Sequence, residues 1–159
     1  MFHYNTLNIY ATQSGSAYNV KMLNKVADMP VIADWIDKDE TIALIDYRGA
    51  WLWDEAIAAN LRVAEMIASK PHRCDIIGNF RSGAMESIRP ALDYARKVLA
   101  QMPNNLGIVV VVTNPVISML ASVYKSLDPK WGARIHTVTT FDQARGIIAE
   151  DRATRHIAS

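Results

Sequence analysis

The stretch VIADWIDKDETIALIDY, residues 31–47, decides the fold that the rest of the sequence predicts. Apolar and polar residues alternate in VIADWID (31–37) and again in TIALIDY (41–47), which is typical of strands that bury one face. Only the three residues KDE separate the two runs, and so short a connection suits an antiparallel pair. The regular part of the chain therefore begins with a β-hairpin.

Outward from the hairpin, helical patterns and apolar strands alternate along the chain. The first helix is predicted to end before Pro71, because apolar residues recur at helical spacing at Ile57, Leu61, Ala64 and Ala68. The run CDIIGNF (74–80) predicts a third strand. It is followed by a second helix, whose apolar face extends from Ile88 to Met102.

The second half of the chain continues this alternation. GIVVVVT (107–113) is apolar on both faces, which indicates a central parallel strand covered on each side. Asn114 followed by Pro115 predicts the start of the next helix, because it combines an N-cap residue with the imino acid best suited to a first turn. RIHTVTT predicts a last strand, and Thr140 with Gln143 forms a capping box that opens a last helix.

These elements predict an α/β domain with a mostly parallel sheet, an antiparallel N-terminal hairpin strand and four helices. We assign residues 29–150 to this single domain, residues 1–28 to a loosely structured or accessory extension, and residues 151–159 to a solvated C-terminal tail. If the helices lie mainly on one face, residues 1–28 or a second copy must cover the other face of GIVVVV. A homodimer is therefore expected.

The composition of the 159 residues narrows the function classes. The 17 basic and 16 acidic residues are scattered, so no nucleic-acid footprint is visible. We expect a cytoplasmic protein, because the chain has one cysteine, no apolar run that could span a bilayer and no secretory signal. Four isolated histidines and the single Cys74 share no ligand spacing, so neither a metal nor a cofactor is predicted.

A glycine-punctuated segment follows the predicted third strand. Gly78 and Gly83 have the spacing of a phosphate-binding loop, but Ala84 and Met85 stand where the required lysine and hydroxyl would be. Nucleotide hydrolysis is therefore not expected, and we assign no catalytic residue. A helix N-terminus beside Arg81 can still bind an anionic ligand or an acidic side chain of a partner.

The order of the elements resembles that of the STAS domain, the sulfate transporter and anti-sigma factor antagonist family. More narrowly, ADWIDKDETIALIDYRGAWLWDE (33–55) resembles the opening of small bacterial STAS-like or Sec14-like proteins of unassigned function, with a tryptophan in the first strand, a glycine and a W-x-W step into the first helix. The resemblance implies a STAS-like fold that binds protein partners without catalysis.

The segment NFRSGAMESIR (79–89) is similar to the phosphorylated motif of the antagonist branch, D-x-S followed by a spacer and M-D-S-[ST]-G. Asn79 takes the place of the aspartate, Arg81 that of the first serine and Ser87 that of the phosphorylated serine, if the spacer is one residue shorter. The final Ser/Thr-Gly pair is absent. The resemblance implies Ser87 or Ser82 as a phosphoacceptor, whereas the local chemistry of Ser87 predicts only that it caps the next helix.

We predict a non-catalytic regulatory or protein-interaction module. Its binding surface would comprise Trp51, Trp53, Asn79, Phe80, Arg81 and Ser82. We expect Trp53 to pack inward and Trp51 to be more exposed. The alternative is a carrier of a small amphipathic ligand or lipid, with a pocket lined by Trp51, Phe80 and Met85. An enclosed apolar cavity there would favour the carrier, and a flat, partly apolar surface would favour a protein partner.

Overall fold

The structure is a computed structural model that describes residues 29–85 and 87–158. The expected extension, residues 1–28, lies outside the described residues. Five strands form one sheet in the order β1-β2-β3-β4-β5. They are β1 (Val31–Trp35), β2 (Ile42–Trp51), β3 (Cys74–Met85), β4 (Leu106–Val112) and β5 (Ile135–Val138). β1 is antiparallel to β2 and the other neighbours are parallel, which confirms the predicted mixed α/β sheet with its N-terminal hairpin.

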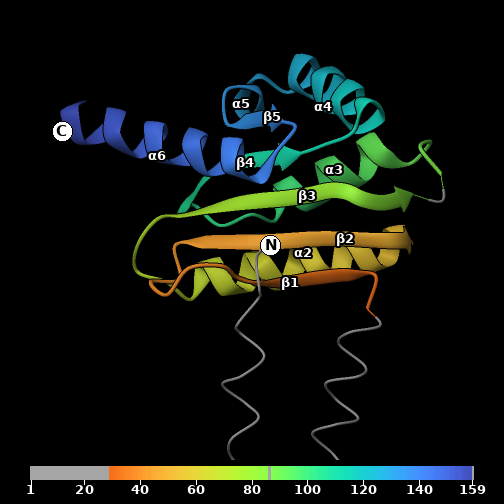
Figure 1. Cartoon of the computed structure of the whole chain (residues 1–159), viewed down its shortest axis with the longest axis horizontal. Coiled ribbons are helices and arrows are strands. Elements are labelled where there is room, and N and C mark those ends of the chain that lie inside the picture. Colours follow the sequence, from red (N-terminus) through yellow and green to blue (C-terminus); the bar gives the residue numbers. More distant parts are fainter. Residues whose placement is uncertain (1–28, 86, 159) are drawn as a thin grey trace, which may run out of the picture.

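Helices cover both faces of this sheet (Figure 1). They are α2 (Trp53–Ala68), α3 (Ala91–Ala100), α4 (Pro115–Leu127), the single turn α5 (Pro129–Gly132) and α6 (Phe141–Ala158). The four predicted helices are present, and α5 is an addition that the sequence analysis missed. The predicted caps form: the Asn114 side chain accepts a hydrogen bond from the Ile117 amide at 3.1 Å, and the Thr140 hydroxyl accepts one from the Gln143 amide at 3.2 Å.

Two apolar cores lie on opposite faces of the sheet. Alternate residues of each strand point to opposite faces, so Ile45 belongs to the core beneath α2, whereas Leu44 belongs to the core beneath α6. β4 contributes to both cores, as its continuous apolar run predicts. Because α6 packs on β3, β4 and β5, the condition under which a second copy was expected to cover β4 is not met.

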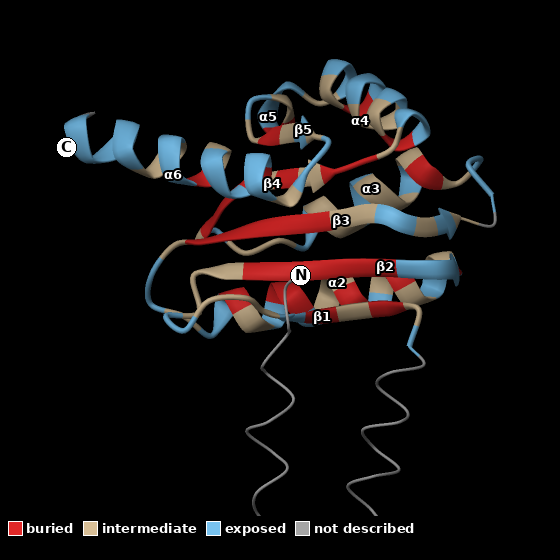
Figure 2. Ribbon diagram, viewed as in Figure 1, coloured by how far each residue is buried: buried red, intermediate tan, exposed pale blue. Residues whose placement is uncertain are grey.

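β2 and β3 are longer than predicted and form a twisted ribbon that extends beyond the covered part of the sheet. Residues 81–85, expected in a loop, continue β3, and Trp51 pairs with Met85 at the ribbon tip. The pairing of β2 with β3 shifts its register between Asp46 and Arg48. Figure 2 shows that β3 is buried along its first half and exposed toward the tip.

The last helix corrects the predicted C-terminal boundary. Residues 151–158 continue α6, and residues 153–157 of it are exposed to solvent as expected of a tail. Asp151 accepts a hydrogen bond from Arg73 at 3.0 Å, and Arg152 donates to Asp75 at 2.9 Å, so this part of the helix is tied to the sheet. None of the described helices is both long enough and apolar enough to cross a bilayer.

Candidate functional site

A cavity of about 200 Å³ lies between the sheet and the helices α2, α3 and α4. Apolar side chains of all three helices and of β2, β3, β4 and β5 form its walls. Trp51, Phe80 and Met85, the residues expected to line a ligand pocket, all face it. The helical wall includes Leu92 of α3 and Leu120 of α4.

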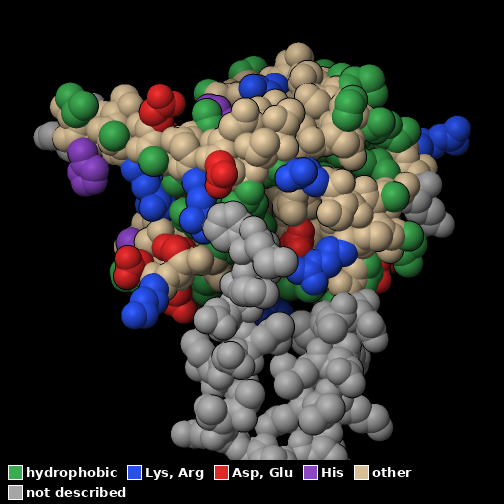
Figure 3. Space-filling view, viewed as in Figure 1, with side chains coloured by type: hydrophobic (Ala, Val, Ile, Leu, Met, Phe, Trp, Pro, Cys, Tyr) green, Lys and Arg blue, Asp and Glu red, His purple; other side chains and the backbone are tan. Residues whose placement is uncertain are grey.

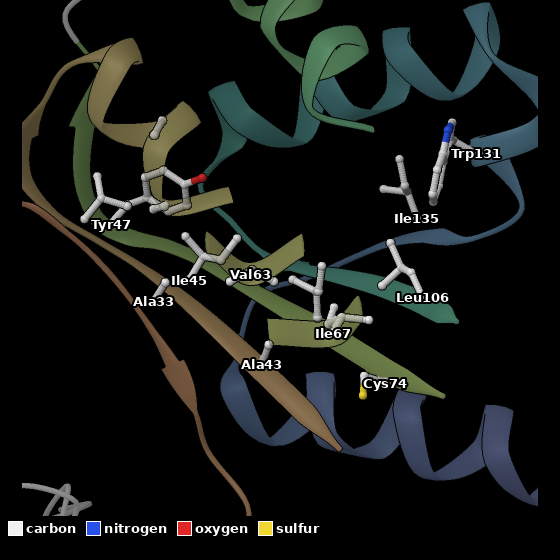
Figure 4. Packing of buried hydrophobic residues seen from close by; sticks show 14 of the residues in the cluster. Ala33, Ala43, Ile45, Tyr47, Val63, Ile67, Cys74, Leu106, Trp131 and Ile135 are labelled. Atoms are coloured by element: carbon white, nitrogen blue, oxygen red, sulfur yellow. The ribbon is translucent and has the colours of Figure 1, made fainter. Parts of the chain in front are cut away.

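A row of aromatic rings forms the wall toward the ribbon. Phe80 stacks on Tyr47 with 3.9 Å between the ring centroids, and Tyr47 lies 4.9 Å from Trp51. Trp51 meets Trp53 edge to face at 5.0 Å, and Trp53 stacks on Tyr94 of α3 at 4.9 Å. Contacts of this kind stabilise a structure beyond the burial of their surface, so the packed rings hold one side of the cavity in place. Figure 4 shows Tyr47 on β2 among the other core residues of this face.

The expected exposure of the two tryptophans is wrong. Trp51 is 2% exposed, whereas Trp53 is only partly buried. The reason is that β2 continues to Trp51, so its side chain points to the same face as Tyr47, two pleats earlier. Trp53 begins α2, and its indole Nε1 donates a hydrogen bond to the Ser87 carbonyl at 2.7 Å. It thereby ties the chain after β3 to α2.

One polar group of the cavity lining, the hydroxyl of Tyr47, can still donate a hydrogen bond. The hydroxyl of Tyr47 accepts a hydrogen bond from the Asn60 amide at 3.0 Å, and Asn60 also donates to the Ala56 carbonyl. Burial raises the pKa of Tyr47 to about 12, so the phenol keeps its proton at neutral pH. Among the described residues no acceptor takes that proton, and the buried Nε1 of Trp51 likewise has no partner. A bound molecule or a water in the cavity that accepts a hydrogen bond would satisfy the Tyr47 hydroxyl.

The structure does not bring the six predicted binding residues together. Trp51, Trp53 and Phe80 line the cavity. Asn79 instead donates to the buried carboxylate of Asp46 at 2.9 Å. That carboxylate also accepts a hydrogen bond from Arg48, so Asn79 belongs to a polar cluster of the ribbon.

Arg81 and Ser82, the remaining two predicted binding residues, are exposed on β3 and belong to neither group. Because their segment is a strand, the helix N-terminus expected beside Arg81 is not there, and α3 begins only at Ala91.

Ser87 does not cap the following helix, contrary to prediction. α3 begins after Pro90, and no side chain caps it. The exposed Ser87 lies three residues earlier, and its hydroxyl oxygen only accepts a long hydrogen bond, 3.4 Å, from the Arg89 amide. Phosphorylation of Ser87 or Ser82 stays a prediction from the sequence.

Sequence reasoning missed the polar pair Tyr47 and Asn60. The alternation in TIALIDY places Tyr47 on the same face as Ala43 and Ile45, which could have marked it as buried. Asn60 lies within the apolar face of α2, an unusual place for an amide without a partner. Within the described ranges, no group of three or more His, Cys, Asp or Glu side chains could hold a metal ion.

Comparison with solved structures gives a likeness in the fold of the backbone. No family model matches the sequence, and no curated protein matches it. Among solved structures, the chain is similar to the Bacillus cell fate determinant SpoIIAA in its phosphorylated form, with a TM-score of 0.48 and 12% sequence identity. The alignment covers 74% of this chain and 98% of that chain.

Proposed function

We propose that this chain is a non-catalytic module that binds a small, largely apolar molecule in the cavity between the sheet and α2–α4. The observation that supports it is an apolar cavity of about 200 Å³ whose lining includes the buried Tyr47 O–H, which has no acceptor among the described residues. Protein interiors are close-packed, and a void costs stability in proportion to its volume. A ligand that fills the void offsets this cost.

The size of the cavity limits the ligand class. An engineered apolar cavity of about 150 Å³ remains dry and binds benzene. The volume of about 200 Å³ found here has room for a single ring with a substituent or for a short chain. A whole phospholipid exceeds it, so we narrow the predicted carrier of amphipathic or lipid molecules to a binder of ring-sized ligands.

The free donors select among such ligands. Tyr47 is protonated at neutral pH, all the more so because burial raises its pKa to about 12, and its O–H has no acceptor among the described side chains and carbonyls. A ligand with a carbonyl or ether oxygen would accept this hydrogen bond, which contributes about 1 kcal/mol. The proposed ligand is therefore apolar with one acceptor, which makes it weakly amphipathic.

A ring-sized ligand pair tests the proposal. Toluene and benzaldehyde have similar shapes, but only benzaldehyde offers an acceptor, and each is titrated while the methyl NMR signals of Leu92 and Leu120 are followed. Saturable shifts at these methyls are expected for both ligands, with tighter binding of benzaldehyde. Tyr47→Phe should remove that preference, about fivefold for one hydrogen bond, and leave toluene binding unchanged.

A matched pair of cavity variants locates the site. Ala121 lines the cavity on α4, whereas Ala58 is exposed on α2. Ala121→Leu should lower the affinity for both ligands at least tenfold, which corresponds roughly to the loss of two buried methylene contacts. Ala58→Leu should have no effect. Shifts spread over the surface, or equal affinity in Ala121→Leu, would refute the proposal.

The second candidate function is the predicted protein-interaction module, and an apolar stripe on α4 favours it. Figure 3 shows hydrophobic side chains gathered over this helix. The stripe consists of Val116, Met119, Val123 and Leu127, each at least 41% exposed and spaced as one helical face. Such a contiguous exposed stripe is typical of a contact surface.

Met119→Lys provides the test of this stripe, because it places a charge at the centre without touching the cavity lining. Self-association of the native chain in sedimentation, lost in Met119→Lys, would identify the partner as a second copy. Identical monomeric behaviour of both proteins would exclude the expected homodimer.

A cytoplasmic location stays a prediction from the sequence.

A further inference from the structure

A second hollow, with basic walls, lies where β3, β4 and β5 begin. It has a volume of about 480 Å³, and its lining includes Arg73, Arg134, Arg155, Asp151 and Gly107. Arg73 directly precedes β3 and Arg134 directly precedes β5, so the parallel arrangement of the strands brings their guanidinium groups to the same edge of the sheet. The cavity proposed above shares none of these residues.

Positive charge exceeds negative charge around this hollow. The carboxylate of Asp75 accepts from Arg73 at 3.3 Å and from Arg152 at 2.9 Å. The carboxylate of Asp151 accepts from Arg73 at 3.0 Å and also pairs with Arg155. Three guanidinium groups, those of Arg73, Arg152 and Arg155, thus share two carboxylates, and Arg134 brings a fourth guanidinium group to the same hollow.

Arg134 lacks a carboxylate partner in the described part of the chain. Its Nε donates to the Gly107 carbonyl at 2.9 Å, Nη2 donates to the Leu106 carbonyl, and the guanidinium lies 4.6 Å from the Trp131 ring centroid. Burial, and then the nearby positive charge of Arg73, lower the pKa of Arg134. Hydrogen bonds to two backbone carbonyls therefore hold the guanidinium group of Arg134 in a place where burial and Arg73 disfavour its positive charge.

Arg73 offers a further unused donor beside it. Its buried Nε has no hydrogen-bond partner among residues 29–85 and 87–158, although its Nη2 donates to both carboxylates. A methyl group built on Gly107 would lie 2.1 Å from this Nε, so Arg73 rests directly on Gly107. Both guanidinium groups thus contact Gly107. That of Arg73 packs against its Cα, and that of Arg134 donates a hydrogen bond to its carbonyl.

We propose that this hollow binds a tetrahedral oxyanion, either inorganic phosphate or the phosphate group of a small organic phosphate, between Arg73 and Arg134. Guanidinium groups suit such a ligand, because their planar donors match phosphate oxygens and form charge-assisted hydrogen bonds. The anion would supply a negative partner for Arg134, which has no carboxylate partner among the described residues. This site is independent of the function proposed for the apolar cavity.

Phosphate titration at constant ionic strength, balanced with sodium chloride, tests this site. Amide NMR signals of Gly107 and Ala133 should shift and saturate within tens of millimolar inorganic phosphate. Arg134→Gln should weaken binding by at least about tenfold, the value of one charge-assisted hydrogen bond. Arg96→Gln is the matched control, because Arg96 is exposed on α3. This variant should bind phosphate with the same affinity as the native chain.

Two further arms keep the test decisive. Arg134→Lys keeps the charge, so it should fold even if Arg134→Gln does not, and it should bind phosphate several-fold more weakly than the native chain. Glycerol phosphate identifies the source of the group: tighter binding than inorganic phosphate indicates an organic phosphate, and equal binding indicates the free anion. Shifts that never saturate, or that persist unchanged in Arg134→Gln or Arg134→Lys, would overturn the proposal.

Discussion

Gly107→Ala is the substitution whose effect the structure defines most closely. A methyl group on Gly107 would lie 1.9 Å from Oδ1 of Asp75 and 2.1 Å from Nε of Arg73, far inside any real contact. Gly107 has no positive φ, so alanine meets no backbone strain there. The loss of stability must therefore come from displacing these two side chains, and it is offset only by the small entropic gain of replacing glycine.

The magnitude follows from what Asp75 loses. Asp75 is fully buried, and its Oδ1 accepts from the Ile108 amide at 2.9 Å in addition to Arg73. Breaking a buried ion pair costs about 3–5 kcal/mol, because one charge stays buried without a partner. Arg73 and Arg152 are partly exposed and can regain water, so we expect about 3 kcal/mol, the lower end of that range. This is a large share of the roughly 5–15 kcal/mol that stabilises a typical domain.

Urea unfolding followed by circular dichroism measures this loss, and Gly146→Ala is the control. Gly146 lies within α6, and a methyl group there would meet nothing within 4 Å. Alanine should therefore raise the free energy of unfolding by about 0.5–1 kcal/mol. The reasoning fails if Gly146→Ala raises the free energy of unfolding as expected while Gly107→Ala lowers it by less than about 1 kcal/mol. Asp75 and its partners would then rearrange around the methyl group at little cost.

Two further predictions concern single side chains. The Tyr47 phenol has a pKa near 10 in the unfolded chain and about 12 in the folded chain. As the pH rises, the unfolded chain therefore loses this proton first. The free energy of unfolding should fall by about 1.4 kcal/mol per pH unit between pH 10 and pH 12. Urea midpoints should show that Tyr47→Phe lacks this part of the decline; an identical decline would contradict the raised pKa. Asn114→Ala should cost about 1 kcal/mol by removing the cap of α4, whereas Ser122→Ala, mid-helix and exposed, should cost much less; equal losses would contradict the capping role.

The elements that could be predicted are those whose cause is local in the sequence. The hairpin follows from period-two alternation on either side of KDE, and β4 follows from an uninterrupted apolar run. The starts of α4 and α6 follow from side chains that bond amides three residues away. In each case the stabilising interaction lies within a few residues of the signal.

The errors arise where distant residues supply the stabilisation. Residues 81–85 contain glycine, serine and arginine, which read as a loop, but the ladder to β2 makes them a strand. Residues 151–158 read as a polar tail, but ion pairs with Arg73 and Asp75 tie the start of this segment to the sheet. Neither partner can be inferred from local pattern, because each lies at least 30 residues away in the sequence.

The same distant pairing that hid the strand also builds the cavity wall. Trp51 reaches the core because β2 extends to pair with Met85, and both residues line the cavity. A methyl group on Gly83 would lie 2.8 Å from Nε1 of Trp51 and 3.0 Å from Cβ of Tyr47, so only glycine admits these rings against β3. The glycine whose spacing resembled a phosphate-binding loop therefore has a packing role, and the basic hollow that we propose for an oxyanion lies where β3 and β4 begin, away from it.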